Sequence, residues 1–217
     1  LAQKGTYEDF YSLWKAMKKK KSLNSGKINT LIEIGYFDNY GSIGKIQKFI
    51  KIIDDLYERS QFSKDKVPEE YHKIIHKYSE ESEKQYRKFD YNAALIEIWN
   101  SLEDFDIPLN QKLKYELEDL GYIKTEIPEL SQDYAFVQGY ECKYKNPKLT
   151  LYRLCDGTIE TVKIKRKQYD NAPIQVGDII KTIERSREGK WSKDANGDWQ
   201  QDNMDKEVIL KKWSFVK

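Results

Sequence analysis

Hydrophobic residues repeat with helical spacing on both sides of a glycine-rich break at residues 35–44. Ile28 and Leu31 belong to the apolar stripe before the break, and Phe49 and Ile53 belong to the stripe after it. The pattern predicts two helices joined by a tight corner. The second helix would begin with its unpaired backbone N–H groups directed outward, an arrangement that suits a phosphate group. An ordinary two-helix corner in a hydrophobic core has the same pattern.

A further amphipathic helix is expected over residues 7–17, with Phe10, Leu13 and Trp14 on its apolar side. Four lysines follow it, either as a solvated helix end or as a phosphate contact. Helix-hairpin-helix units hold a nucleic-acid backbone without reading its bases. We interpret residues 1–60 as such a region. Its candidate DNA contacts are Lys18, Lys19, Lys20, Lys21, Gly41, Ser42, Gly44, Lys45 and Lys48.

Residues 61–133 are acidic and are expected to form a helical connector. One helix is predicted from Pro68 towards Lys88, with proline in its first turn. Others are predicted over residues 91–102 and 111–120, the last ending at Gly121.

From residue 134 the hydrophobic period changes from about 3.6 to 2. Strands are expected at residues 134–144, 149–154, 158–165, 179–185 and 207–216, with a long polar loop at 186–205. The Asp156-Gly157 pair is a strong hairpin signal. Five strands with one long loop indicate an OB-like β-barrel over residues 134–217, although a small SH3-like barrel has nearly the same spacing. The predicted fold class is therefore α+β.

Such barrels bind single strands by placing cations along the backbone and aromatic rings against the bases. Trp191 and Trp199 lie in polar surroundings, which suits stacking on bases, and they would equally suit packing across a hairpin. The candidate nucleic-acid contacts of the barrel are Tyr152, Arg153, Lys163, Lys165, Arg166, Lys167, Arg187, Lys190 and Trp191.

Three short motifs occur in a recognisable order along the chain: G-T-Y-E-D-F at residues 5–10, L-I-E-I-G-Y-F-D at 31–38 and E-L-E-D-L-G-Y at 116–122. Together they resemble the C-terminal part of the DNA polymerase III alpha subunit, the bacterial replicative polymerase of the C family. The resemblance covers nearly the whole chain, through the OB-fold that the family carries in its last third. It includes the second helix-hairpin-helix of the family's tandem, but neither the first hairpin nor the catalytic palm. It therefore implies a fragment that binds duplex DNA through its helical region and single-stranded template through its barrel.

The same resemblance implies a sliding clamp or other replisome subunits as possible partners. The family's clamp-binding peptide, Q-x-x-[LM]-F, has a degenerate counterpart in Gln85-Tyr86-Arg87-Lys88-Phe89. Lys88 stands there where an apolar side chain should fill a pocket, and burying its charge costs several kcal/mol unless the side chain extends to water.

Net charge is only +2, but it is unevenly distributed. Residues 1–60 hold 11 basic and 7 acidic residues, residues 61–133 hold 10 and 17, and residues 134–217 hold 17 and 12. Basic ends around an acidic middle fit two nucleic-acid-facing regions joined by a scaffold, or simply solvated surfaces. With two cysteines, no signal-peptide pattern and no long apolar run, we expect a cytoplasmic protein without a membrane segment.

No catalytic constellation is recognisable in the sequence, and no cofactor is expected. Polymerase chemistry needs clustered aspartates that hold two metal ions, and neither Asp54-Asp55 nor the pair Asp104 and Asp106 fits that pattern. His72 and His76 have the i, i+4 spacing of metal ligands but lack an obvious third ligand. Two other classes remain open: a protein-interaction scaffold that docks replisome subunits, and an RNA-binding module.

Overall fold

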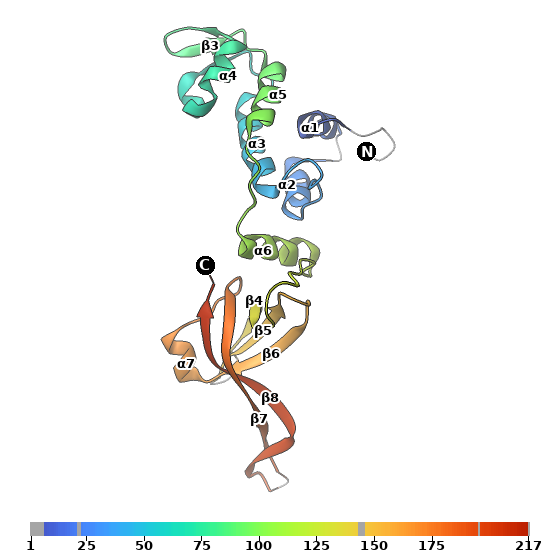
Figure 1. Ribbon diagram of the computed structural model, residues 1–217, viewed down its shortest axis with the longest axis vertical. Coiled ribbons are helices and arrows are strands. Elements are labelled where there is room, and N and C mark those ends of the chain that lie inside the picture. Colours follow the sequence, from blue (N-terminus) through green and yellow to red (C-terminus); the bar gives the residue numbers. More distant parts are fainter. Residues whose placement is uncertain (1–6, 21–22, 143–145, 195, 217) are drawn as a thin grey trace. The chain divides into compact units, whose positions relative to one another are not determined.

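The computed structural model describes residues 7–20, 23–142, 146–194 and 196–216. The chain divides into two compact units, Leu1–Ile107 and Pro108–Lys217. The predicted connector at residues 61–133 is thus shared between the two units. The fold is α+β, as the change of hydrophobic period indicated (Figure 1).

The first unit is built mainly from helices around an aromatic core. Its longer helices are α1 (Phe10–Lys18), α2 (Ser25–Glu33), α3 (Ile43–Leu56) and α5 (Tyr91–Ser101). Phe10 lies at its centre, with its ring centroid 5.5 Å from those of Phe37 and Trp99. Each helix begins at a side chain that accepts a backbone N–H, and these caps are Asp9, Asn24, Ser42 and Asp90.

The corner between α2 and α3 is the predicted one. Gly35 follows α2 with φ +71°, in the left-handed region. This backbone conformation favours glycine, and a Cβ there would also lie 2.7 Å from a carboxylate oxygen of Asp38, whose side chain would have to move.

The stretch between α3 and α5 is not one helix. It contains the short helices η1 (Lys64–Lys66), η2 (Glu69–Tyr71) and α4 (His72–Lys77), together with the strands β1 (Gln61–Ser63), β2 (Glu80–Glu81) and β3 (Gln85–Arg87). The strands form an antiparallel sheet in the order β1-β3-β2. The described part of residues 1–60 contains helices and no strand, as predicted. The predictions of a purely helical connector over residues 61–133 and of one helix from Pro68 towards Lys88 are wrong.

The second unit consists of a five-stranded closed barrel with α6 (Leu109–Leu120) packed against it. The strands are β4 (Tyr134–Glu141), β5 (Lys148–Arg153), β6 (Ile159–Ile164), β7 (Ile179–Lys193) and β8 (Trp199–Phe215), with α7 (Arg166–Asn171) between β6 and β7. Around the barrel their order is β4-β5-β6-β8-β7. Every pair is antiparallel except β6 and β8, which run parallel, and β4 pairs with β7 to close the barrel.

Two hydrophobic layers stabilise this unit. Leu149 and Leu151 of β5 belong to the core cluster inside the barrel, whereas Tyr152 packs with Leu113 of α6. Both faces of β5 are therefore covered near Tyr152, one by the barrel core and the other by α6. For this reason the sequence of β5 does not show which face is exposed to solvent.

β7 and β8 continue beyond the barrel as a two-stranded ribbon (Figure 1). Their pairing extends from Ile180 and Phe215 in the barrel to Lys193 and Trp199 near the tip. The polar segment at residues 186–205 is therefore not a loop but a hairpin whose turn lies at Asn196-Gly197, where Gly197 has φ +88°.

Candidate nucleic-acid interface

The N-cap residue of α3, next to the turn where we expected a phosphate, is hydrogen-bonded to a carboxylate of the same unit. Asp104 Oδ1 accepts a hydrogen bond from the Ser42 backbone N–H at 2.9 Å and from the Ser42 hydroxyl at 2.5 Å. These hydrogen bonds, from the hydroxyl first, hold the pKa of Asp104 below its usual range. Ser42 is thus engaged as a helix cap and as a partner of Asp104.

Gly44, in the first turn of α3, is also covered. A Cβ at this position would lie 2.5 Å from the Phe105 carbonyl oxygen, so only glycine fits beneath residue 105. The Ser42 N–H is therefore not open to DNA as we expected, and residue 105 lies directly against Gly44. Gly41 lies beside the Lys45 and Trp99 side chains.

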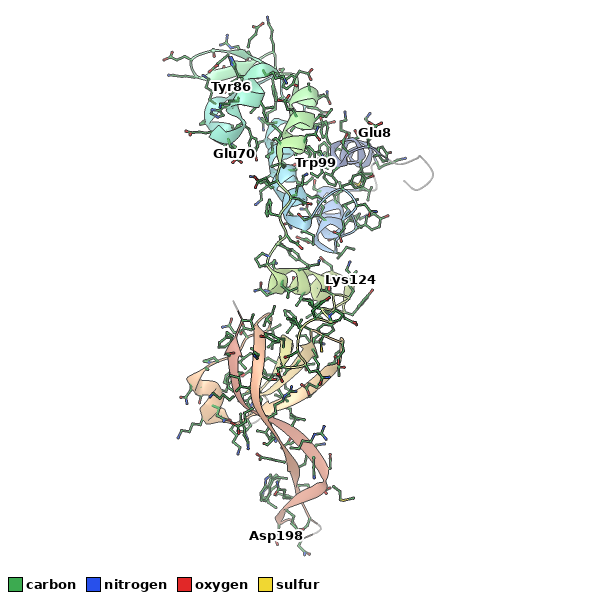
Figure 2. The ribbon with its side chains drawn as sticks, viewed as in Figure 1. Glu8, Glu70, Tyr86, Trp99, Lys124 and Asp198 are labelled. Carbon is green, nitrogen blue, oxygen red and sulfur yellow. The ribbon has the colours of Figure 1, made fainter. Side chains whose placement is uncertain are left out.

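The lysines after the corner contact other groups of the first unit. Lys45 Nζ lies 4.4 Å from the centroid of the Trp99 ring, which Figure 2 labels. Lys48 forms an ion pair with Glu70 at 3.0 Å, and this partner raises the pKa of Lys48. Each of the two lysines therefore already makes a contact within the unit, which a DNA phosphate would have to share or replace.

The lysine run at the C-terminal end of α1 is the most exposed part of the predicted DNA contact in the first unit. Lys18, Lys19 and Lys20 are exposed, and Lys18 Nζ lies 5.6 Å from the Trp14 ring centroid. Lys21 lies outside the described residues.

The segment that resembles a clamp-binding peptide is part of the small sheet. Gln85, Tyr86 and Arg87 form its middle strand, hydrogen-bonded on both sides. Tyr86 is 2% exposed and Phe89 is 5% exposed, so its aromatic side chains are buried in this unit. In this conformation the segment is unavailable as an extended peptide.

The two histidines make separate contacts. His72 Nε2 lies 3.0 Å from the Val67 carbonyl oxygen, and His76 Nδ1 lies 2.7 Å from a Glu81 carboxylate oxygen. In the part of the chain that the structure describes, no three His, Cys, Asp or Glu side chains gather as metal ligands.

A lysine-lined groove lies on the outer side of the barrel, where β5 and β6 face the base of the ribbon. We call it the lysine groove. It is lined by Lys148, Thr161, Lys163, Lys190, Lys206, Glu207 and Val208. Lys148 and Lys163 are directly paired across β5 and β6, which places two cations side by side.

Two of the groove lysines have carboxylate partners. Lys163 forms an ion pair with Glu207 at 2.8 Å, and Lys190 pairs with Asp205 at 2.8 Å, which raises the pKa of Lys190. Lys148 and Lys206 are exposed and have no ion-pair partner among the described residues. The groove thus carries a net positive charge, and the ion pairs with Glu207 and Asp205 hold two of its lysine side chains in place.

Several predicted barrel contacts lie elsewhere. Tyr152 is 4% exposed, and its hydroxyl donates to the Thr125 carbonyl oxygen at 3.0 Å, so its side chain is not open to a nucleic acid as we expected. Arg153 pairs with Asp156 at 3.1 Å, outside the groove.

The remaining basic candidates are spread over the barrel surface rather than gathered. Arg166 pairs with Asp170 at 2.8 Å, and Lys165 lies 3.9 Å from Glu188. Lys167 and Arg187 are exposed. Of the predicted barrel residues, the groove therefore brings together Lys163 and Lys190.

Sequence reasoning missed Lys148, Thr161 and Lys206. In the observed register Tyr152 pairs with Ile159 and Lys148 pairs with Lys163. A two-residue turn at Asp156-Gly157 would instead pair Lys148 with Lys165, so the turn signal predicts the hairpin but not this pair of lysines. Lys206 depends on β8 crossing between β6 and β7, which no local pattern encodes.

Comparisons with protein-family models, with curated proteins and with solved structures found no match for this chain. Among the described residues, no helix is long and apolar enough to cross a membrane.

Proposed function

We propose that this chain is a nucleic-acid-binding part of a replicase resembling the DNA polymerase III alpha subunit, and that its barrel binds single-stranded DNA. The observation that carries the proposal is the lysine groove, in which Lys148, Lys163, Lys190 and Lys206 line one surface. A row of cations along a barrel groove suits a single-strand backbone.

We further propose that the barrel is an OB-fold. In a simple meander each strand pairs with the next, whereas here β8 lies between β6 and β7 and runs parallel to β6. A five-stranded barrel with this crossover supports an OB-fold over the other small barrel considered. In OB-folds, the surface of the second and third strands is the usual oligonucleotide site, and β5 and β6 hold that place here.

The test is fluorescence anisotropy of a labelled oligo-dT strand, the same length of duplex, and an oligo-U strand, each over a salt series. We expect salt-dependent binding that favours the single DNA strand. Each lost phosphate contact lowers the slope of log K against log salt by about 0.7 for a single strand. The double variant Lys148→Ala/Lys206→Ala should therefore reduce the slope by about 1.4.

Lys114→Ala is the matched control, because Lys114 is an exposed lysine on α6 of the same unit. It should leave the slope unchanged. Equal slopes for the groove variant and the wild type would remove the groove from the interface. An absence of binding at low salt would favour the scaffold function, and tighter binding of oligo-U would favour an RNA ligand.

We propose that the duplex contact implied by the resemblance is made by the exposed lysines at the C-terminal end of α1. Because Asp104 covers the start of α3, we assign this contact to Lys18, Lys19 and Lys20. Replacing all three with alanine should weaken duplex binding equally for all sequences and flatten its salt slope.

A further inference from the structure

The ribbon formed by β7 and β8 carries two strongly exposed tryptophans. Trp191 is 61% exposed and Trp199 is 64% exposed. Large aromatic rings normally bury most of their surface, so two open rings on one hairpin indicate a surface that meets a ligand. Figure 2 labels Asp198, which precedes Trp199 at the far end of the ribbon from the barrel.

Both rings lie on the same face of the ribbon. Trp191 is paired with Gln201, and Lys193 is paired with Trp199. Directly paired residues share a face, and residues two apart on a strand do as well, so the two tryptophans are diagonal neighbours. Neither ring has an aromatic partner directly across the ribbon, so they do not plug a hairpin core. We call this surface the tryptophan face.

The tryptophan face begins beside the lysine groove. Lys190, which lines the groove, directly precedes Trp191 in β7, and Gly189 is paired with Lys206, another groove residue. Trp191 is thus two residues, or about 7 Å, beyond Gly189 along the strand. The register shift between Gly189 and Lys190 twists the ribbon at this point.

The ribbon differs from the groove in the sign of its net charge, which indicates a different role in binding. Residues 186–205 contain three basic and five acidic residues, so this segment does not attract phosphates by net charge. Asp194 accepts the backbone N–H groups of Asn196 and Asp198 at the turn, and Asp205 pairs with Lys190. The accessible chemistry that remains on this face is aromatic, with Lys193 Nζ 5.7 Å from the Trp199 ring centroid.

We propose that the tryptophan face stacks on unpaired bases of the strand whose backbone lies in the lysine groove. This inference rests on the proposed single-strand function and adds a second component to the same site. The groove supplies affinity that depends on salt, whereas the ribbon supplies affinity that depends on the presence of bases. Paired bases are stacked on each other inside a duplex, so the ribbon also accounts for a preference for single strands.

The experiment compares two strands of equal length on the full chain: oligo-dT, and an abasic strand that keeps the sugar-phosphate backbone but lacks bases. The wild type should bind oligo-dT more tightly than the abasic strand. Trp191→Ala/Trp199→Ala should lose at least tenfold in affinity for oligo-dT, because stacking contributes about 1–3 kcal/mol per base. The same variant should match the wild type on the abasic strand and keep the wild-type salt slope.

Trp191→Phe/Trp199→Phe is the conservative variant, and it should keep most of the affinity because the rings remain. Lys148→Ala/Lys206→Ala should weaken binding of both strands equally. Equal wild-type affinity for both strands, with the groove variant still weaker, would overturn the ribbon inference and leave the proposed function standing. A loss by the tryptophan variant on both strands would also overturn the inference, because it would indicate a structural or backbone role. No salt-dependent binding to either strand would overturn both proposals.

Discussion

Glu116 is a buried carboxylate that determines the path of the chain after α6. It is 1% exposed, and its Oε2 accepts the backbone N–H groups of Lys124 and Thr125 at 3.0 Å each. Its Oε1 accepts the Thr125 hydroxyl at 2.6 Å. The Tyr152 hydroxyl then donates to the Thr125 carbonyl oxygen, so one carboxylate links α6, the following loop and the barrel.

Glu116→Ala should lower the free energy of unfolding of the second unit by about 3 kcal/mol. The variant removes the carboxylate that accepts two part-buried backbone N–H groups and the Thr125 hydroxyl, and each lost hydrogen bond costs about 0.5–1.5 kcal/mol. Urea unfolding followed by circular dichroism measures this loss. Glu118→Ala, at an exposed position two residues along the same helix, should change stability by less than about 0.5 kcal/mol. Similar losses for both variants would contradict the role assigned to Glu116.

Asp104 should make the stability of the first unit depend on pH in the acid range. Its pKa is lowered by the Ser42 hydroxyl and N–H, so the unfolded chain binds the proton more tightly than the folded one. The stabilisation is complete above the unfolded aspartate pKa of about 3.9 and is lost as pH falls through the folded value. Asp104→Asn should be less stable than the wild type near neutral pH, and the difference should shrink towards pH 3.

Urea unfolding at a series of pH values, with the wild type and Asp104→Asn side by side, isolates this group from the other carboxylates. Because Asp104 is exposed, we expect a small effect. A difference that stays constant with pH would show that the carboxylate charge does not contribute.

At the scale of elements, two helical glycines in the first unit predict opposite outcomes. Gly44 in α3 leaves 2.5 Å between an added Cβ and the Phe105 carbonyl oxygen, whereas Gly26 in α2 has only Asn24 Oδ1 near, at 3.6 Å. Gly44→Ala should destabilise by about 1–3 kcal/mol through overpacking. Gly26→Ala should stabilise by about 0.5–1 kcal/mol, because alanine is the better helix former. Thermal unfolding of the two variants tests the contrast, which would fail if both shifted in the same direction.

Helix positions were largely predictable because capping and apolar spacing are local. Asp9, Asn24 and Ser42 each precede an apolar stripe, and each caps a helix in the structure. The stretch between Pro68 and Lys88 was not predictable in the same way. Its helical spacing continues only to Tyr78, and the backbone then pairs with β1, a contact distant in sequence.

The ribbon was missed for a different physical reason. A two-stranded ribbon in water has no buried face, so its residues need not alternate between apolar and polar. Only the Asn196-Gly197 turn signalled a hairpin there. The groove was predicted only in part: Lys163 and Lys190 were among the predicted contacts and belong to it. Lys206 lies beside them only because of the order of the strands in the barrel, which the sequence pattern does not show.

At the scale of the whole molecule, each unit has its own hydrophobic core. Phe10 and Phe49 belong to the core of the first unit, and Leu149 and Leu210 belong to that of the second. We therefore expect two separable unfolding transitions.

Differential scanning calorimetry of the full chain tests this expectation with variants already described. Glu116→Ala should lower the midpoint of one transition only, and Gly44→Ala should lower the midpoint of the other only. A single transition that both variants shift equally would show instead that the two units unfold as one cooperative body.

The crossover of β8 between β6 and β7 has a consequence for the making of the protein. β6 cannot gain its parallel neighbour, and β7 cannot complete its pairing, until Val208, Ile209 and Leu210 have left the ribosome. At about 5–20 residues per second, the stretch from β4 to β8 takes on the order of 4–16 s to synthesise. Throughout that interval the nascent barrel has open edges that expose apolar strands to other chains. Chaperone demand during translation should therefore fall sharply once β8 has emerged.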